Sequence, residues 1–351
     1  MRRGLISAVA AGAAASLSVA EAAAWWQPPV NTTWQWQLQF QVNTSFQVDM
    51  YDVDLFDVSI STFDEMKAMG SVVICYFSAG TQEDWRDDAD DFPAAALGGP
   101  LGDWEGEVWV DVNNEDVRAV MTARLDLAAE KGCDGVEPDN VQVYLEGNST
   151  VTGVNVTGAQ QLEYNKFLAE EAHLRNLSIG LKNDLEHMVE LEPFFDWGIN
   201  ESCFEYDECD IYTTTFIKAN KAVFHTEYER DNLNFCVETN AMGLSSLLKS
   251  YDLGPERCSC QDPSTDNQCG LLLEEGEVPP PSSTSSSDTS SGTSSETEAP
   301  TSASSGTPAP TVAVTVEPAS GAGRRFVVGE KITIMALLAT GAAAAFGAVC
   351  A

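Results

Sequence analysis

The sequence is poor in basic residues and in histidine. Its 351 residues include 18 lysines and arginines against 54 aspartates and glutamates, which gives a formal net charge of −36. So acidic a surface repels the phosphate backbone, which excludes nucleic acid as a natural partner, and it attracts cations. The same charge would equally suit the solubility of a secreted protein. Three histidines are too few for a typical histidine-rich zinc site, and we predict neither a metal nor a cofactor.

Two segments have the composition of unfolded or removable sequence. Residues 1–24 combine two early arginines, an apolar stretch and a small-residue site, which is typical of a secretory signal peptide cleaved after Ala22 or Ala24. Residues 273–322 are rich in serine, threonine and proline. Such a segment cannot bury enough apolar surface to fold, so it predicts a disordered stalk.

Residues 323–351 place a spacer before an uncharged run, Ile332–Ala351. A small-residue site, a polar spacer and a hydrophobic tail are typical of the signal for a glycosylphosphatidylinositol (GPI) anchor, with a transmembrane helix as the alternative. We therefore expect a secreted monomer on the outer face of the plasma membrane or in the cell wall. Its contact with the membrane would be through a lipid anchor only.

Nine cysteines are present, and Cys350 lies in the predicted tail. The other eight are an even number in a predicted secreted protein, which favours disulfides over metal ligands. Cys203 with Cys209, and Cys236 with the cluster Cys258–Cys269, are candidate local bridges. Spacing alone leaves the connectivity open.

Between residues 25 and 272, short apolar runs of strand character alternate with helical patterns such as Glu115–Lys131 and Ala159–Arg175. The eight predicted strands are Trp34–Phe40, Val48–Phe56, Ser71–Ala79, Glu107–Val112, Gly135–Val141, Ser178–Asp184, Asp196–Glu201 and Lys221–Tyr228. This alternation predicts an α/β fold, a single (β/α)8 TIM barrel. A doubly wound open sheet is the alternative, but the glycine-rich phosphate turn that usually follows its first strand is missing.

One predicted strand carries three carboxylates, Asp134, Glu137 and Asp139, in the segment Gly-Cys-Asp-Gly-Val-Glu-Pro-Asp-Asn at 132–140. Buried carboxylates are costly unless they are paired or used. Strand alternation places Glu137 and Asp139 on one face, and Pro138 ends the strand. We therefore predict Asp139 at the carboxyl end of the strand, where an α/β barrel keeps its catalytic groups, and Glu137 one layer deeper.

Other predicted strands also end in polar residues, which predicts a carboxylate-rich pocket. Hydrolysis of a glycosidic bond needs two carboxyl groups, one to protonate the leaving oxygen and one to attack or to activate water. Asp139 and Glu201 could face each other across a barrel mouth. The alternative is that either carboxylate caps a helix or pairs with Lys182 or Arg124.

Five ordered segments carry a resemblance that spans about Trp34 to Cys260. They are Tyr51–Phe56, Val73–Gly80, Cys133–Asn140, Ile179–Asp184 and Asn200–Phe204. Together they resemble glycoside hydrolase family 114, the endo-α-1,4-polygalactosaminidases. The resemblance implies a (β/α)8 barrel that cleaves α-1,4-linked galactosamine-containing polysaccharide with retention. It also implies that Asp139 is the nucleophile and Glu201 the acid/base, with Asp134 and Glu137 as alternatives to Asp139 in the same motif.

Further polar residues are predicted to contact the substrate or to support the pair. They are Asp52, Asp54, Tyr76, Asp111, Glu137, Lys182, Asn183 and Asp184. Each could alternatively cap a helix or form an inter-strand ion pair. Galactosamine with a free amine is a cation, so an acidic pocket predicts a deacetylated polymer as partner. Alternatives to this function are the same mechanism on another α-linked glycan and a carbohydrate-binding surface protein without activity.

Overall fold

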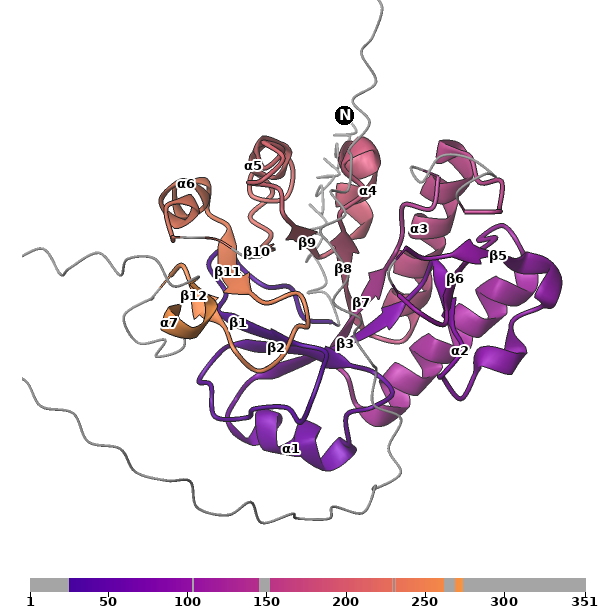
Figure 1. Cartoon of the computed structure of the whole chain (residues 1–351), viewed down its shortest axis with the longest axis horizontal. Helices are drawn as coiled ribbons and strands as arrows, with labels where there is room; N and C mark the ends of the chain where they lie inside the picture. The colour runs from indigo at the N-terminus through magenta and orange to yellow at the C-terminus, as the bar shows by residue number, and fades with distance from the viewer. Residues whose placement is uncertain are drawn as a thin grey trace, which may run out of the picture. The chain divides into compact units, whose positions relative to one another are not determined.

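The computed structural model describes residues 25–102, 104–144, 152–228, 230, 232–261 and 269–273 (Figure 1). The predicted signal peptide, the predicted stalk from residue 274 onward and the predicted anchor signal lie outside the described residues. No helix among the described residues is both long and apolar enough to cross a membrane.

The described residues form a curled sheet of parallel strands, extended at one edge by a short antiparallel strand. In spatial order the strands are β1 (Trp34–Gln37), β2 (Met50–Asp54), β3 (Val72–Ser78), β7 (Gly135–Asp139), β8 (Ser178–Lys182), β9 (Trp197–Glu201), β10 (Val223–Tyr228), β11 (Ser245–Lys249) and the antiparallel β12 (Cys258–Ser259). The first and last parallel strands, β1 and β11, approach each other: Trp34 Nε1 in β1 donates to the Ser245 carbonyl in β11 at 2.9 Å. Such a sheet is consistent with the TIM-barrel architecture of many glycoside hydrolases.

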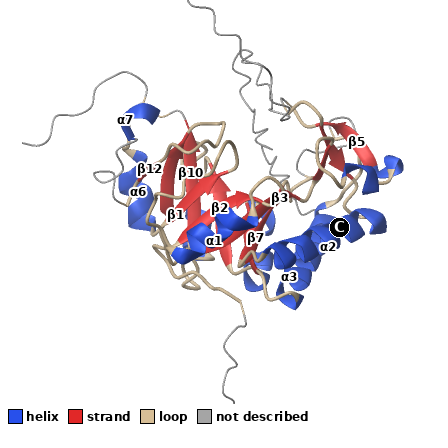
Figure 2. Ribbon diagram, turned by 90° about the horizontal axis from the view of Figure 1, so that it is seen from below, coloured by secondary structure: helices blue, strands red, loops and turns tan. Residues whose placement is uncertain are grey.

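Helices connect the strands and cover the outer face of the sheet (Figure 2). They are α1 (Ile60–Ala68), α2 (Glu115–Lys131), α3 (Gly158–Leu174), α4 (Met188–Leu191), α5 (Asp210–Thr214), α6 (Phe235–Met242) and α7 (Cys269–Leu272), with short 3₁₀ turns at Ala89–Asp91, Ala94–Ala96, Leu185–His187 and Glu192–Phe194. The Asn114 side chain caps α2 by accepting from Asp116 N at 2.8 Å, and Gly132, with φ of 86°, ends that helix. The capping residues Asn114 and Gly132 therefore set the two ends of α2.

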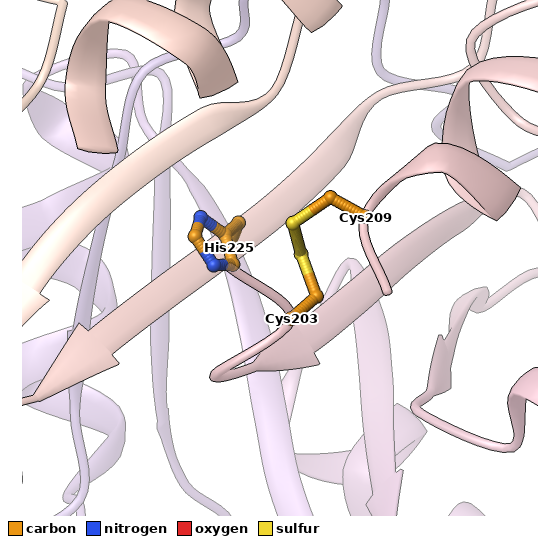
Figure 3. Close-up of side chains that lie close together, drawn as sticks. All are labelled: Cys203, Cys209 and His225. Atoms are coloured by element: carbon orange, nitrogen blue, oxygen red, sulfur yellow. A yellow bond between two sulfur atoms is a disulfide. The ribbon is translucent and has the colours of Figure 1, made fainter. Parts of the chain in front are cut away.

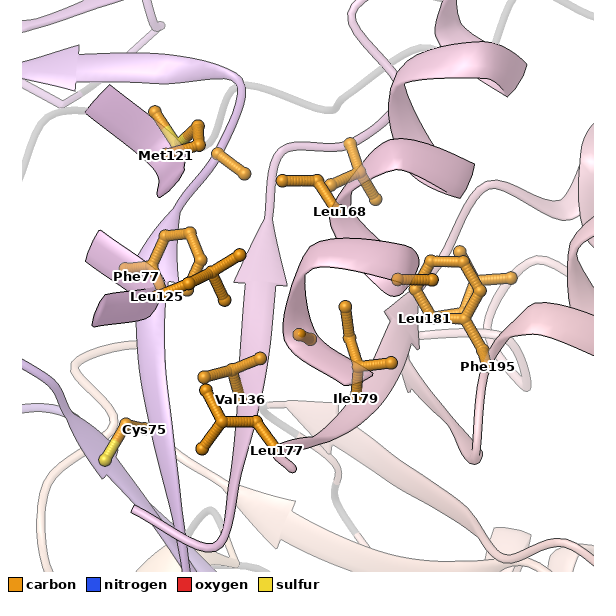
Figure 4. Packing of buried hydrophobic residues seen from close by; sticks show 14 of the residues in the cluster. Cys75, Phe77, Met121, Leu125, Val136, Leu168, Leu177, Ile179, Leu181 and Phe195 are labelled. Carbon is orange, nitrogen blue, oxygen red and sulfur yellow. The ribbon is translucent and has the colours of Figure 1, made fainter. Parts of the chain in front are cut away.

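Apolar side chains fill both faces of the sheet, as expected for parallel strands covered by helices. Outside the sheet, Leu125 from α2 and Leu168 from α3 pack with Val136 and Ile179 from β7 and β8 (Figure 4). On the concave face a second cluster includes Trp34, Ile74, Trp197 and Phe224. This aromatic layer underlies the polar carboxyl ends of the strands.

One predicted strand does not belong to the parallel sheet. The segment predicted as Glu107–Val112 forms β6 (Glu107–Val110), which pairs antiparallel with β4 (Thr81–Glu83) and β5 (Leu97–Pro100) in a separate small sheet. The last parallel strand is instead Ser245–Lys249, which we did not predict. The alternating pattern of residues 107–112 correctly indicates a strand but carries no information about its partner.

Four disulfides are present in the described residues: Cys75–Cys133, Cys203–Cys209, Cys236–Cys260 and Cys258–Cys269. Cys203–Cys209 and the bridges within the C-terminal cluster match the local candidates from the sequence. Cys75–Cys133 was not predicted, because its partners lie 58 residues apart and meet only where β3 pairs with β7.

Candidate active site

The carboxyl ends of β7, β8 and β9 bring three charged groups together. Lys182 Nζ lies 2.9 Å from Asp139 Oδ1 and 2.9 Å from Glu201 Oε2. Because both oxygens contact the same nitrogen, they can be no farther apart than twice that distance, about 5.8 Å. The two carboxylates predicted from the sequence are therefore neighbours across a buried cation.

These two carboxylates are also the solvent-accessible members of the cluster. The side chains of Asp139 and Glu201 are 20% and 32% exposed, whereas those of Lys182 and Glu137 are 1% and 0% exposed. Glu137 thus lies one layer deeper than Asp139, as strand alternation predicts. Asp134 pairs with Lys67 before β7 begins, so it stands at the opposite end of that strand from Asp139.

Beneath the pair lies a second pair of carboxyl groups. Glu137 accepts hydrogen bonds from Trp36 Nε1 at 3.0 Å and from Lys182 Nζ at 3.3 Å. Asp52, also fully buried, lies close enough to Glu137 for the two groups to affect each other's pKa. Burial raises the pKa of Asp52 to about 7, and burial together with the nearby Asp52 raises the pKa of Glu137 well above its ordinary value.

Lys182 remains charged in spite of its burial. Burial lowers the pKa of its amine, but the carboxylates of Asp139, Glu201 and Glu137 offset this effect, and the pKa is raised well above the ordinary lysine value. Lys182 therefore acts as a fixed cation under the Asp139–Glu201 pair.

Two tyrosines complete the surroundings of the pair. The Tyr76 hydroxyl donates to Asp139 Oδ2 at 3.3 Å, and the Tyr228 hydroxyl donates to Glu201 Oε1. Burial, followed by the charge of the nearby carboxylate, raises the pKa of both phenols, so both keep their protons as donors. The backbone N–H of Asn140 is a third donor to Asp139, with the nitrogen 2.7 Å from Oδ1.

Asn183 supports Glu201 through the backbone. Its Oδ1 accepts from Glu201 N at 3.1 Å and from Asn200 Nδ2 at 3.0 Å. The residues that follow β7, β8 and β9 (Asn140, Asn183 and Ser202) have φ values of 59°, 47° and 64°. Left-handed backbone is uncommon outside glycine, and it turns the chain sharply at each of these strand ends.

Three predicted substrate residues have protein partners instead. Asp54 is buried and pairs with Arg86 at 2.6 Å, and Asp184 is buried and accepts hydrogen bonds from Tyr144 and Asn165. The prediction that Asp111 ends a barrel strand is wrong: it follows β6 in the small sheet, where it accepts from Asn113 N. We therefore expect these three carboxylates to support the structure rather than to touch substrate.

Tyr228, at the end of β10, was not among the site residues predicted from the sequence. Its strand neighbours His225 and Glu227 face outward: His225 contacts Ser246 Oγ and Glu227 Oε1, both at 2.9 Å. Alternation of side chains along β10 would have identified Tyr228. Thr226 pairs with Glu201 in β9, so Tyr228, two positions after Thr226, lies on the same face of the sheet as Glu201.

His225 also lies close to two sulfur atoms, those of Cys203 and Cys209 (Figure 3). A cysteine binds a metal as the thiolate. These two sulfurs are joined in a disulfide, so this cluster does not supply thiolate ligands.

The comparisons with known proteins agree with this geometry. The model of glycoside hydrolase family GH114 matches residues 15–265. The crystal structure of Ega3 from Aspergillus fumigatus in complex with galactosamine is 39% identical, covering 67% of this chain and 97% of that one, with a TM-score of 0.62. The glycoside hydrolase domain of PelA from Pseudomonas aeruginosa is 13% identical, covering 64% of this chain and 96% of that one, with a TM-score of 0.51, and shares the fold.

No curated protein sequence matches the chain significantly. The family match spans well over half of the sequence and includes Asp139 and Glu201. The chain therefore belongs to glycoside hydrolase family GH114 and is an O-glycosyl hydrolase.

Proposed function

We propose that this hydrolase is secreted, is held at the cell surface by a lipid anchor, and cleaves α-1,4-linked galactosamine-containing polysaccharide with retention. Asp139 is the nucleophile and Glu201 the acid/base. The observation that carries the proposal is the single buried lysine that holds both carboxylates within about 5.8 Å of each other. Retaining enzymes keep their carboxyl groups about 5–5.5 Å apart, whereas inverting enzymes leave about 6.5–9.5 Å for a water molecule.

The surroundings of each carboxylate fit its proposed part. Asp139 accepts from Lys182, Tyr76 and the Asn140 amide, and this set of donors stabilises a carboxylate that attacks the anomeric carbon. Glu201 is the more exposed of the two, so the leaving oxygen and then a water molecule can reach it. It gives its proton to the leaving oxygen, and after the glycosyl-enzyme ester forms it takes a proton from the attacking water.

The charge of the site favours a cationic sugar. The loop that follows Glu201 exposes Glu205, Asp207 and Glu208. A galactosamine amine that is not acetylated carries a positive charge and gains from these carboxylates, whereas an N-acetylated sugar is neutral. The galactosamine bound to the similar Aspergillus protein supports this substrate class.

The test measures oligosaccharides released from a partly deacetylated galactosaminogalactan by the wild-type protein and by Asp139→Asn and Glu201→Gln. Each variant should lose about 100-fold or more in rate. Asp134→Asn is the matched control: it changes a carboxylate of the same motif at the opposite end of β7 and should retain activity. A substantially active Asp139→Asn would move the nucleophile elsewhere.

Two further measurements settle the finer points. The anomeric configuration of the first product, followed by NMR, should be that of the substrate, and inversion would refute the roles assigned to the pair. Added salt should raise KM for the deacetylated polymer. If a folded wild type cleaves only a different α-linked glycan, the mechanism stands and the substrate assignment fails; binding without cleavage would favour a binding protein.

A further inference from the structure

An exposed aromatic ring lies one side chain away from the proposed acid/base. The Tyr228 hydroxyl at the end of β10 donates to Glu201 Oε1. The ring of Tyr251, two residues beyond the end of β11, stacks on the ring of Tyr228, with the ring centroids 4.6 Å apart and 16° between the planes. In the sheet, β10 and β11 follow β9 on the side away from β7. The stack therefore lies beyond Glu201 as seen from Asp139.

The Tyr251 ring covers Tyr228 and is itself accessible. Tyr228 is 5% exposed, whereas Tyr251 is 56% exposed. Because stacking on Tyr228 occupies one face of the Tyr251 ring, the solvent meets the other face and the edge. Single exposed apolar side chains are common, so this exposure alone does not indicate a binding site.

The backbone beside Tyr251 supplies a second, independent observation. Leu38 N and Gln39 N, in the loop after β1, donate to the Leu253 carbonyl in the loop after β11, at 3.1 and 3.4 Å. Phe40 in the first loop is 69% exposed and has a φ of 64°, and Leu253 in the second has a φ of 48°. Left-handed backbone is rare for bulky side chains, and such strain concentrates at ligand sites. The joined loops thus keep a strained backbone where they expose two aromatic rings.

We propose that Tyr251 and Phe40, together the aromatic rim, bind the sugars on the leaving-group side of the polysaccharide. The inference rests on the proposed function, because it takes Glu201 as the acid/base. Glu201 protonates the glycosidic oxygen, so the sugar that departs with this oxygen lies on the Glu201 side of the site. The 4-hydroxyl of galactosamine is axial, which leaves the opposite face of the ring with C–H groups that pack on an aromatic face. Tyr251 binds the first departing sugar, and Phe40 binds a sugar further along the chain.

Two substrates separate the aromatic rim from the reacting pair. One is a galactosamine oligosaccharide, whose leaving group is a sugar. The other is the α-glycosyl fluoride of a galactosamine oligosaccharide, whose leaving group is a fluoride ion that has no ring to stack. Tyr251→Ala should lower kcat/KM for the oligosaccharide by about 10-fold and that for the fluoride by less than about 2-fold. Tyr251→Phe keeps the ring and should retain the wild-type values on both substrates.

Phe40→Gly tests the second ring without a cost in stability. Glycine adopts a φ of 64° without strain, so the thermal unfolding temperature should stay the same or rise. The kcat/KM for a long oligosaccharide should still fall by about 3-fold or more, with the fluoride unaffected. Leu174→Ala is the matched control: it removes a 75% exposed apolar side chain at the C-terminal end of α3 and should act as wild type on both substrates.

The outcomes separate this inference from the proposed function. In Tyr251→Ala, equal losses on both substrates would overturn the inference, because they would indicate damage to Tyr228 and Glu201, and so would an unchanged rate on the oligosaccharide. An unchanged Phe40→Gly would overturn the part assigned to Phe40. If wild type cleaves neither substrate, the proposed function fails, and calorimetric binding of the oligosaccharide decides: weaker binding to Tyr251→Ala than to wild type supports the aromatic rim, whereas equal or absent binding overturns it.

Discussion

Replacing Arg86 should reveal how much of the site's framework depends on one buried cation. Arg86 donates to both oxygens of Asp54, at 2.6 and 3.0 Å, and to both oxygens of Glu83, at 2.9 and 3.0 Å. The three side chains are 1–3% exposed. Arg86→Met would leave two carboxylates buried without this partner. Breaking a buried ion pair in this way typically costs about 3–5 kcal/mol.

The measurement is the free energy of unfolding, obtained from urea denaturation followed by tryptophan fluorescence. Arg175→Met is the matched control. Arg175 also contacts two carboxylates, Asp126 and Glu171, but those are 66% and 25% exposed, so its loss should cost about 1 kcal/mol or less. A loss below about 1 kcal/mol in Arg86→Met would refute the reasoning.

A compensating variant tests the cause of the loss. Arg86→Met combined with Asp54→Asn and Glu83→Gln removes both buried charges together with their partner. It should recover much of the lost stability, because the cost of breaking such a pair comes largely from the charge left behind. No recovery would show that Arg86 contributes mainly through its packing on Phe56, over which its guanidinium lies at 4.6 Å.

Three shorter predictions follow from other parts of the fold. In Gly180→Ala the added methyl would overlap the indole of Trp197, so thermal unfolding should reveal a loss of about 1–3 kcal/mol or more. Trp25→Ala removes an indole N–H that donates to the buried Asp196 carboxylate at 2.8 Å, and should cost about 1–2 kcal/mol in the same assay. Burial raises the pKa of Asp52 from 3.8 to about 7, so the folded state holds a proton that the unfolded chain releases. Stability should therefore fall by roughly 2–4 kcal/mol as the pH rises from about 4 to about 7, and Asp52→Asn should flatten this dependence.

The sequence was sufficient to predict that Asp139 and Glu201 lie at the same edge of the sheet, because parallel strands align their carboxyl ends, whereas their selection as the catalytic pair came from the resemblance to family 114. Asp139 and Glu201 lie 62 positions apart, yet each ends a strand, and one residue, Lys182 at the end of the strand between them, contacts both. Alternation within a strand also predicted correctly that Glu137 lies below Asp139. Both inferences depend on local periodicity, which the sequence contains directly.

Long-range partners were not predictable in the same way. From the sequence, Asp54 was predicted to contact the substrate. In the fold it pairs with Arg86, and nothing near Asp54 in the sequence indicates that contact. The strand Ser245–Lys249 has few of the β-branched and aromatic residues that mark strands. Its pairing with β10 and its link to Trp34 make it part of the sheet, and these are properties of the assembled fold.

The charge of Lys182 explains how a strongly acidic protein can keep two carboxylates so close. If both were ionised at about 5.8 Å, their repulsion at an effective dielectric constant of ~20 would be about 3 kcal/mol. Each would also attract the lysine at half that distance, by roughly twice as much, so the lysine more than offsets the repulsion. The short spacing of the two carboxylates thus depends on a cation whose side chain is only 1% exposed. Lys182→Met should therefore disrupt the geometry of the pair as well as its charge, and a cationic substrate amine could not restore it, because that amine would approach from the solvent side.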